Sequence, residues 1–370
     1  MEFAVNKADL VRELNLSQGV VEKKTTIPIL SNVLVEADGD RLILTATDLE
    51  LGVRCSCVAK VKKSGSGTIP AKKFLDYVRL LPDGEINVKF AENQWASITC
   101  GRSKTRIAGM SRESFPELPI MPEPLAEIPV KTLAQMISKT IFAISAEESR
   151  FTLNGALLLV RPDGMVMVST DSHRLALVEH KVDLTNLKAP YRALLPRKAM
   201  NEILKMAADA GDEAKLIFSG DDNHLFFQLG ERLLISRKLT GNFPEFERVL
   251  PKDQPNMLVL GRDELRGSLE RVLQFADERS KAIKLTTGDG EFKLHSSLSE
   301  TGESEETISA SYDGPSVQIG FNGQYILDFL RATAETEVSF HFKDGGAAGE
   351  LRPAGDVNYT YRYIVMPMRI

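Results

Sequence analysis

Five consecutive polar residues, Thr170-Asp171-Ser172-His173-Arg174, contain the three side-chain types that a serine hydrolase uses. In such an enzyme the serine attacks the substrate, the histidine accepts the serine proton, and the aspartate orients the histidine. Neighbouring residues of an extended strand point to opposite faces, so three consecutive residues do not converge on one reacting atom. The sequence also has neither a phosphate-binding loop nor a GxSxG elbow. We therefore expect that the protein is not an enzyme.

Residues that could bind a metal or undergo oxidation are sparse. The five histidines are scattered along the chain, and no group of histidines and cysteines has the spacing of a metal site. The three cysteines, Cys55, Cys57 and Cys100, are an odd number, which favours free buried thiols in a reducing compartment. We expect no metal and no cofactor.

Length and composition favour a cytoplasmic protein of two or three domains. The chain has 370 residues, of which 43% are hydrophobic and 26% charged. No apolar run reaches the roughly 18 residues of a membrane helix, and the first residues lack the pattern of a secretion signal. We therefore expect no membrane association. The net charge of −5 argues against a protein covered with nucleic-acid-binding charge, but it is compatible with a basic stripe on one face.

The polar run follows a strand pattern that occurs more than once. Residues 165–175 (MVMVSTDSHRL) alternate apolar residues before the polar run begins. Residues 42–51 (LILTATDLEL) have Thr47-Asp48 in the place of Thr170-Asp171, at a distance of 123 residues, and residues 292–298 (FKLHSSL) are a fainter copy. Three copies of one pattern indicate an internal repeat.

Longer units repeat around this strand. Pro70 and Pro196 each precede a helical pattern and lie 126 residues apart, while Phe115 and Phe243 each precede Pro-Glu and lie 128 residues apart. The helical patterns cover residues 7–16, 71–80, the region around 133–137, and residues 197–208, 262–275 and 324–332. Residues 300–306 are acidic, and we expect them to form a solvated loop.

This organisation predicts an α+β chain of three repeated domains, each with two helices packed on an antiparallel sheet. The predicted domains are residues 1–122, 123–252 and 253–370. Domains of this kind can join at their sheet edges, which hides the edge strands and leaves all helices on one side. A head-to-tail contact repeats until it closes, and closure gives a ring.

The predicted helices carry basic residues outside their apolar stripes. In a ring with its helices inside, they would lie near the hole: Lys7, Arg12, Lys72, Lys73, Arg79, Arg197, Lys198, Lys205, Arg262, Arg266 and Arg271. Such a lining attracts a phosphate backbone without reading bases. Each of these cations, taken singly, is also compatible with an ordinary solvated helix face.

Several motifs give the chain, over its full length, a resemblance to the β subunit of bacterial DNA polymerase III, the sliding clamp family. The motifs are residues 150–155 (RFTLNG), 170–175 (TDSHRL), 196–198 (PRK), 243–244 (FP), 248–251 (RVLP), 320–322 (GFN) and 365–369 (VMPMR). One motif alone is weak, but their order and spacing make the match specific. Ser172 departs from the pattern, which often has glycine there, and Thr152 lacks an aromatic ring that some relatives offer to DNA.

The resemblance implies a homodimer closed head to tail as a ring of six clamp-type domains around double-stranded DNA. It implies a DNA sliding clamp, a processivity factor that performs no chemistry and binds DNA of any sequence. The expected partners are the replicative DNA polymerase, the clamp loader, and other replication or repair proteins that carry a clamp-binding linear motif. The alternative is a non-catalytic adaptor that binds linear motifs without encircling DNA. It predicts a monomer, and it leaves the repeated basic helices unexplained.

By matched position, the resemblance implies a peptide-binding pocket between the second and third domains. The residues that it assigns to the pocket are Arg150, Leu153, Thr170, Ser172, His173, Arg174, Leu175, Pro244, Arg248, Val249, Asn322, Tyr325, Ile364, Val365, Met366, Pro367, Met368 and Arg369. Leu175, Val249, Val365 and Met366 would bury a leucine or phenylalanine anchor at roughly 1.5–3 kcal/mol each. We expect His173, Arg174 and Asn322 to bond polar groups of the peptide.

The resemblance also implies a DNA surface and a dimer contact. The residues expected to contact DNA are Lys24, Arg12, Lys72, Lys73, Arg79, Arg197 and Lys198. In the dimer, Thr105 and Ile107 on an edge strand of the first domain would face Leu273 and Phe275 of the third domain. Strand pairing and a small apolar cluster are the expected interactions.

Overall fold

One order of elements occurs three times along the chain. The computed structural model describes residues 1–21, 26–184, 187–288, 290–298 and 302–369. Within these residues each repeat consists of a strand, a helix, four strands, a second helix and three strands. The predicted α+β class and the predicted three-fold repeat are therefore confirmed, with two α-helices in each repeat as expected.

The elements of the three repeats have the following bounds. The first repeat contains β1 (Glu2–Asn6), α1 (Lys7–Val20), β2 (Asn32–Asp38), β3 (Arg41–Thr47), β4 (Leu51–Lys63), β5 (Gly65–Pro70), α2 (Ala71–Leu80), β6 (Glu85–Phe90), β7 (Trp95–Cys100) and β8 (Ser103–Ala108). The second contains β9 (Ala126–Pro129), α3 (Val130–Thr140), β10 (Gly155–Arg161), β11 (Gly164–Thr170), β12 (Arg174–Lys181), β13 (Tyr191–Pro196), α4 (Arg197–Ala207), β14 (Lys215–Gly220), β15 (His224–Leu229) and β16 (Arg232–Arg237). The third contains β17 (Asn256–Gly261), α5 (Arg262–Val272), β18 (Ala282–Gly288), β19 (Glu291–Leu298), β20 (Gly302–Ser309), β21 (Val317–Asn322), α6 (Gly323–Ala332), β22 (Glu337–Phe342), β23 (Gly349–Pro353) and β24 (Tyr359–Val365).

The chain forms two compact units, and the division runs through the second repeat. One unit consists of Met1–Ala134 and Lys198–Lys238, and the other of Gln135–Arg197 and Leu239–Ile370. In the first unit β4 pairs with β16, so the first repeat shares a twelve-stranded sheet with β9 and β14–β16. In the second unit β12 pairs with β24, which joins β10–β13 to strands of the third repeat. The predicted joining of repeats at their sheet edges is confirmed within each unit. The domain boundaries stay a prediction.

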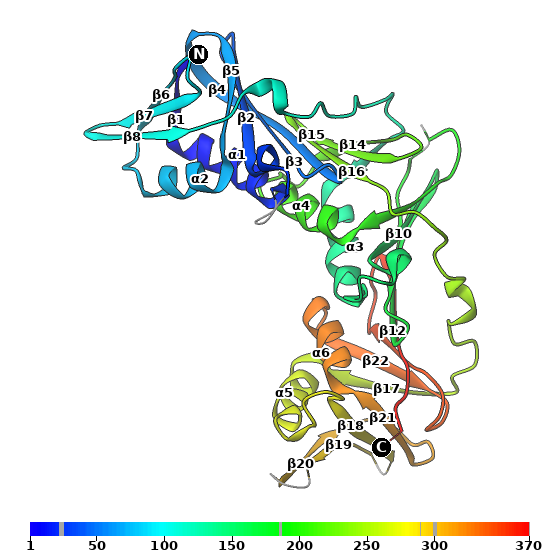
Figure 1. The fold of residues 1–370 in the computed structure, drawn as a ribbon. Coiled ribbons are helices and arrows are strands. Elements are labelled where there is room, and N and C mark those ends of the chain that lie inside the picture. The colour runs from blue at the N-terminus through cyan, green and yellow to red at the C-terminus, as the bar shows by residue number, and fades with distance from the viewer. Residues whose placement is uncertain (22–25, 185–186, 289, 299–301, 370) are drawn as a thin grey trace. The chain divides into compact units, whose positions relative to one another are not determined.

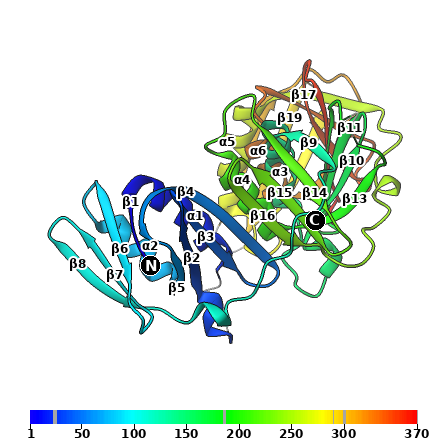
Figure 2. The same ribbon diagram turned by 90° about the horizontal axis from the view of Figure 1, so that it is seen from above.

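In the first and third repeats the two helices pack against each other and against strands of the same repeat. In the first repeat α1 and α2 lie side by side, and α1 also contacts β3 and β4 (Figure 1, Figure 2). The predicted apolar stripe of α2 is buried at Phe74, Leu75 and Val78, and it packs in one core cluster with Leu10 and Leu14 of α1. In the third repeat α5 contacts α6 and strands β17, β19 and β20 (Figure 1). The sheets thus leave both helices of each of these repeats on the same side.

The predicted acidic loop is wrong for the part of it that the structure describes. Residues 302–306 belong to β20, which pairs with β19 along its full length, and residues 300–301 lie outside the described residues. Glu306 bonds the guanidinium of Arg271 at 2.7 Å and 2.8 Å, so this carboxylate is paired on the sheet. Strand pairing and ion pairing outweigh the low strand preference of glutamate.

The cysteines match the predicted free thiols. Cys55, Cys57 and Cys100 are buried and form no disulfide. Burial raises the pKa of the Cys57 thiol to about 12. In the described part of the chain, no helix combines the length and the apolar character needed to cross a membrane.

Candidate functional site

The polar run forms a tight turn between β11 and β12. Asp171 Oδ1 accepts hydrogen bonds from the backbone N–H groups of His173 and Arg174, both at 3.0 Å. Thr170 Oγ1 accepts from the N–H of Ser172 at 3.1 Å and donates to the carbonyl of Arg174 at 2.6 Å. Ser172 has a φ of 78°, in the left-handed region that glycine adopts most easily. This conformation explains why the family pattern often has glycine at this position. The side chains of Thr170 and Asp171 form hydrogen bonds within the turn.

The same turn occurs between β3 and β4. Asp48 Oδ1 accepts from the N–H groups of Glu50 at 3.0 Å and Leu51 at 2.6 Å. Thr47 Oγ1 donates to the carbonyl of Leu51 at 2.9 Å, and Leu49 has a φ of 77°. The repeat seen in the sequence therefore extends to individual hydrogen bonds.

Beside the turn between β11 and β12 lies a cavity of about 180 Å³, called the pocket below. It is lined by Thr170, Ser172, Arg174, Leu175, Pro244, Phe246, Val249, Ile364 and Met366. Leu175, Phe246 and Ile364 are 2%, 7% and 1% exposed and belong to one hydrophobic cluster. Val249 and Met366 are each 37% exposed. A buried apolar floor with an exposed apolar rim suits an apolar side chain of a ligand.

Eight of the nine lining residues are among those assigned to the pocket from the sequence. They come from β11, β12 and the turn between them, from the segment of residues 242–250 that follows β16, and from the end of β24 with the residue after it. Phe246 is the lining residue absent from the predicted set. The available signal was its position three residues after Phe243, inside the repeated Phe-Pro-Glu segment.

All three nitrogen atoms of the Arg174 guanidinium group donate hydrogen bonds that hold the turn in place. Its Nε donates to Asp171 Oδ2 at 3.0 Å, Nη1 to Asp328 Oδ2 at 2.5 Å, and Nη2 to the carbonyl of Phe142 at 2.7 Å. The guanidinium carbon also lies 4.3 Å from the ring centre of Tyr325. Burial opposes the charged form of this side chain, but the nearby tyrosine and aspartate groups raise its pKa. These contacts leave the guanidinium little capacity to bond a peptide, contrary to the role we expected for it.

Several other predicted residues do not line the pocket. Arg150 Nη1 donates to Ser172 Oγ at 2.9 Å, and Leu153 belongs to the hydrophobic cluster below the pocket. Val365 is only 2% exposed, and Arg248 makes an exposed ion pair with Glu245 at 2.5 Å.

Residues near the end of the chain divide between two places. The N–H of Met366 donates to the carbonyl of His173 at 2.9 Å, which fixes Met366 at the rim of the pocket. Pro367 separates it from Met368, whose N–H donates to the carbonyl of Gly320 at 2.8 Å. Met368 and Arg369 line a different, more open depression on β18, β19 and β21. The structure therefore does not bring them into the pocket.

Two predicted residues lie at the start of α6: Asn322 directly precedes the helix, and Tyr325 is in its first turn. The side chain of Asn322 caps this helix, because its Oδ1 accepts from the N–H of Gln324 at 3.0 Å. Burial raises the pKa of Tyr325, whose ring lies against Arg174. Neither residue lines the pocket.

The cations on α2 are the most accessible of the predicted DNA contacts. Lys72, Lys73 and Arg79 are exposed. Lys72 and Lys73 form no ion pair within the described residues, while Arg79 bonds Asn15 and lies 4.0 Å from the carboxylate of Asp76. Two full positive charges therefore remain on the surface of this helix.

The other predicted DNA contacts are more constrained. Arg12 pairs with Asp9 and Glu13, each at 3.0 Å. Lys198 donates to the carbonyl of Val20 at 3.0 Å and bonds Asp48. Arg197 is exposed and bonds the carbonyl of Ile141 at 3.4 Å. Lys24 lies outside the described residues.

The residues predicted for the dimer contact lie at or beside two sheet edges. Within the described residues β8 pairs only with β7, and β20 pairs only with β19. Thr105 is half-buried on β8 and Ile107 is buried. Leu273 and Phe275 lie in a 3-10 turn, η6 (Leu273–Phe275), which contacts β20.

Metal ligands do not gather anywhere in the described chain. No three His, Cys, Asp or Glu side chains among those residues come together as metal ligands would. The described geometry thus contains a turn, an apolar pocket, cationic helices and two open strand edges.

Comparisons with known proteins give one answer over the whole length. Models of the DNA polymerase III beta subunit match in order: its N-terminal domain at residues 1–119, its central domain at 127–245 and its C-terminal domain at 247–369. The chain is 33% identical over 372 residues to the beta sliding clamp of Chlamydia muridarum, covering 100% of this chain and 99% of that relative. It is likewise 33% identical over 377 residues to the beta sliding clamp of Pseudomonas putida, covering both chains completely.

Solved structures agree with these relatives. The sliding clamp of Pseudomonas aeruginosa bound to griselimycin is 30% identical, has a TM-score of 0.93 and is covered at 100%, as is this chain. The beta sliding clamp of C. crescentus is 31% identical with a TM-score of 0.92, at 100% coverage of this chain and 99% of the other. The chain therefore belongs to the DNA polymerase III beta subunit family, the beta sliding clamps, and is a non-catalytic processivity factor of DNA polymerase III.

Proposed function

We propose that two copies of this chain close head to tail into a ring around double-stranded DNA. The observation that carries the proposal is a rule of pairing between repeats. In both junctions within the chain, the fourth strand of one repeat pairs with the eighth strand of the next: β4 with β16, and β12 with β24. The remaining fourth strand is β20 and the remaining eighth strand is β8, and both lie at sheet edges. A second copy of the chain supplies the missing partner for each.

The register of this contact follows from the first junction. There, Gly52 faces Ile235 and Arg54 faces Leu233. The registers of the hairpins show which residues of β20 and β8 occupy the same positions. On β20, Glu303 matches Gly52 and Glu305 matches Arg54. On β8, Arg106 matches Ile235 and Lys104 matches Leu233. The proposed pairs are therefore Glu303 with the Arg106 of the second copy, and Glu305 with its Lys104. Opposite charges facing each other across strands stabilise the pairing by about 0.2–1 kcal/mol each.

The same register is compatible with the apolar contacts expected in the dimer. It sets Ile107 opposite Gly302, and Thr105 opposite Ser304. A Cβ atom at Gly302 would lie 3.5 Å from the ring of Phe275, so a side chain that covers this glycine would also contact Phe275. Edge pairing and a small apolar contact thus support the same interface.

Charge exchange across the interface tests the proposal. Light scattering across a dilution series should give 2 × 40.9 = 81.8 kDa for the natural chain. Arg106→Glu and Glu303→Arg should each shift the mass toward 40.9 kDa, and the two changes together should restore the dimer. Arg161→Glu, at an exposed arginine of β10, is the control and should leave the mass unchanged. A natural chain that is monomeric throughout, or a double variant no better than the single ones, contradicts the proposed ring.

The ring would hold DNA by its backbone. The exposed cations of α2, with Arg197 on α4, support a contact with phosphates that does not read sequence. This arrangement lets the ring slide while it tethers the replicative DNA polymerase in the cytoplasm.

We further propose that the pocket binds the linear motif of each partner, including the polymerase, the clamp loader and other replication or repair proteins. The buried floor at Leu175 and Ile364 and the exposed rim at Val249 and Met366 support an apolar leucine or phenylalanine anchor. Methionine adapts to anchors of different shape, which suits a shared site.

Competition tests the proposed use of the pocket. A fluorescein-labelled hexapeptide with adjacent leucine and phenylalanine should bind, and unlabelled griselimycin, which the P. aeruginosa clamp binds, should displace it. Leu175→Asp should abolish both interactions, because it places a carboxylate in an apolar floor. Unchanged binding in a folded Leu175→Asp variant contradicts the assignment.

A further inference from the structure

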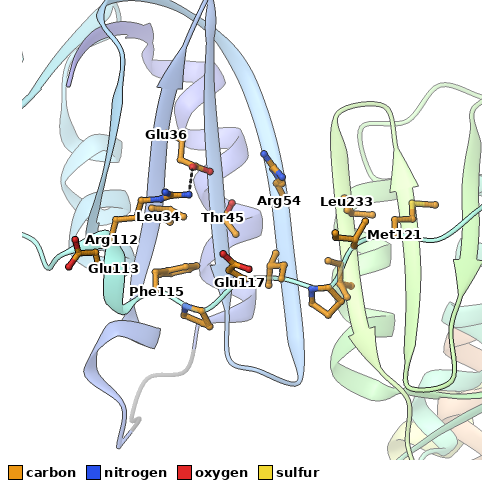
Figure 3. A pocket seen from close by; sticks show the side chains of 15 residues that line it. Leu34, Glu36, Thr45, Arg54, Arg112, Glu113, Phe115, Glu117, Met121 and Leu233 are labelled. Atoms are coloured by element: carbon orange, nitrogen blue, oxygen red, sulfur yellow. Dashed lines mark hydrogen bonds and ion pairs between the residues drawn. The ribbon is translucent and has the colours of Figure 1, made fainter.

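The first junction between repeats contains a cavity built on the same plan as the pocket. The first connecting segment, residues 112–121, crosses the sheet at β2–β4 and β16 and encloses about 620 Å³. This volume lies within the roughly 300–1,000 Å³ of ligand sites. Figure 3 shows Phe115 and Glu117 on this segment, with Leu34 and Thr45 on the strands beside it. We call this space the first-junction cavity.

Four residues that line the first-junction cavity match residues that line the pocket. The matches are Pro116 with Pro244, Leu118 with Phe246, Met121 with Val249, and Ile235 with Ile364. Three of these pairs follow from the shared Phe-Pro-Glu sequence, and the fourth follows from the strand registers. Each connecting segment therefore builds a cavity against the same pair of strands.

One glycine changes where the open space lies. Gly52 is matched with Leu175, which forms the floor of the pocket. Leu118 lies directly over Gly52, because a Cβ atom added at this glycine would be 2.8 Å from Leu118 Cδ2. Leu118 thus fills the place that the anchor would take, and the open space extends instead toward Thr45 and Arg54.

Polar residues occupy positions that are apolar in the second repeat. The matched pairs are Glu36 with Leu159, Thr45 with Val168, and Arg54 with Leu177. Arg112 bonds the carboxylate of Glu36 at 3.1 Å, drawn as a dashed line in Figure 3. Arg54 is exposed and forms no ion pair within the described residues. A guanidinium without an ion pair at the wall of this cavity attracts a ligand with a carboxylate.

We propose that the first-junction cavity is a second peptide-binding site, for an extended segment of a partner protein with one carboxylate between aliphatic side chains. The carboxylate pairs with Arg54, and the aliphatic side chains lie against Ile235. Ile120, which is 91% exposed, covers them from the connecting segment. Glu113 and Glu117 also line the cavity and disfavour negative charge elsewhere in the segment, while Arg54 attracts the single carboxylate. The site is independent of the pocket and of its proposed partners.

Two matched peptides test this site on the full-length protein. With isoleucine methyl groups labelled for NMR, the amidated peptide acetyl-Ile-Glu-Val should shift the signals of Ile120 and Ile235 saturably. The peptide acetyl-Ile-Gln-Val, which lacks the charge, should bind about tenfold more weakly. Arg54→Leu should remove this difference, while Arg41→Leu, at an arginine outside the cavity, should preserve it.

Four results would overturn the proposal. The first is no shift at Ile235 up to about 10 mM peptide, and the second is equal binding of the two peptides. The third is a charge preference that survives in Arg54→Leu. Shifts at Ile364 without shifts at Ile235 also overturn it, because the peptide would then occupy the pocket. That outcome leaves the proposed function of the pocket intact.

Discussion

Val249 and Val259 offer a matched test of the pocket. Both are valines in the same compact unit, and both are 37% exposed. Val249 lines the pocket, whereas Val259 lies on β17 and does not. Substitution by alanine therefore removes two methyl groups in each case, and the two valines are equally exposed. The pocket assignment predicts that only Val249→Ala weakens peptide binding.

The expected size of this effect follows from the exposed fraction of the valine. Two buried methyl groups are worth about 1.6 kcal/mol at about 0.8 kcal/mol each. An anchor that covers the remaining 37% of Val249 gains roughly 0.6 kcal/mol from them, which is about threefold in Kd. The remaining part of the two methyl groups is already buried in the protein without peptide. Both alanine variants should therefore lose about 1 kcal/mol in their free energy of unfolding.

Fluorescence anisotropy with the labelled Leu-Phe peptide measures the difference in Kd, and denaturant unfolding measures stability. Val249→Ala should weaken binding about threefold and Val259→Ala should leave it unchanged. Val249→Asp should weaken binding at least about thirtyfold, because the anchor would cover a carboxylate. Equal effects of the two alanine variants on Kd would contradict the pocket assignment.

Three further predictions concern other parts of the molecule. Removal of residues 366–370 should abolish peptide binding and leave the dimer mass unchanged; binding that survives contradicts the role of Met366. Lys72→Glu together with Lys73→Glu should weaken binding equally for DNA of unrelated sequences and reduce the slope of log K against log salt by about two, and a loss confined to one sequence contradicts the backbone contact. Burial raises the pKa of Glu202 above its ordinary 4.5, so the folded state favours the protonated form, and this stabilisation is lost as pH rises through the raised pKa. Glu202→Gln should therefore raise the Tm more at pH 7 than at pH 4.5, and an equal or opposite shift contradicts this account.

The surroundings of the Glu202 carboxylate disfavour its charged form. Its side chain is 3% exposed, Lys205 bonds Oε1 at 2.7 Å, and Oε2 has no hydrogen-bond partner among the residues that the structure describes. Oε2 lies where a Cβ atom at Gly19 would be only 2.2 Å away, so α1 covers the carboxylate with a glycine. A neutral amide of the same shape removes the buried charge.

The helices could be predicted from the sequence because local periodicity determines them. The pattern over residues 71–80 gave the bounds of α2, and the pattern over 262–275 gave α5 with the following 3-10 turn. Strand β20 could not be predicted, because its glutamates disfavour a strand and its formation depends on β19 and on Arg271. Local signals failed where a distant partner decides the conformation.

The pocket could be predicted in part for a related reason. Eight of its nine lining residues lie in or beside motifs that the resemblance aligned, so the sequence named them as candidates, and their role in peptide binding stays a prediction. The side-chain partners of Arg174 could not be predicted, because Asp328 and Phe142 are far from it in sequence. The same limit applies to Met368 and Arg369, whose backbone bond to Gly320 directs them away from the pocket.

The proposed ring can slide along DNA only if it encloses the duplex. The most direct measurement loads the protein onto nicked circular DNA with the clamp loader and ATP, then separates bound from free protein by gel filtration. We predict that the protein elutes with circular DNA and is released when a restriction enzyme linearises the same molecules. Protein that stays bound equally after linearisation would contradict enclosure and support an ordinary surface contact.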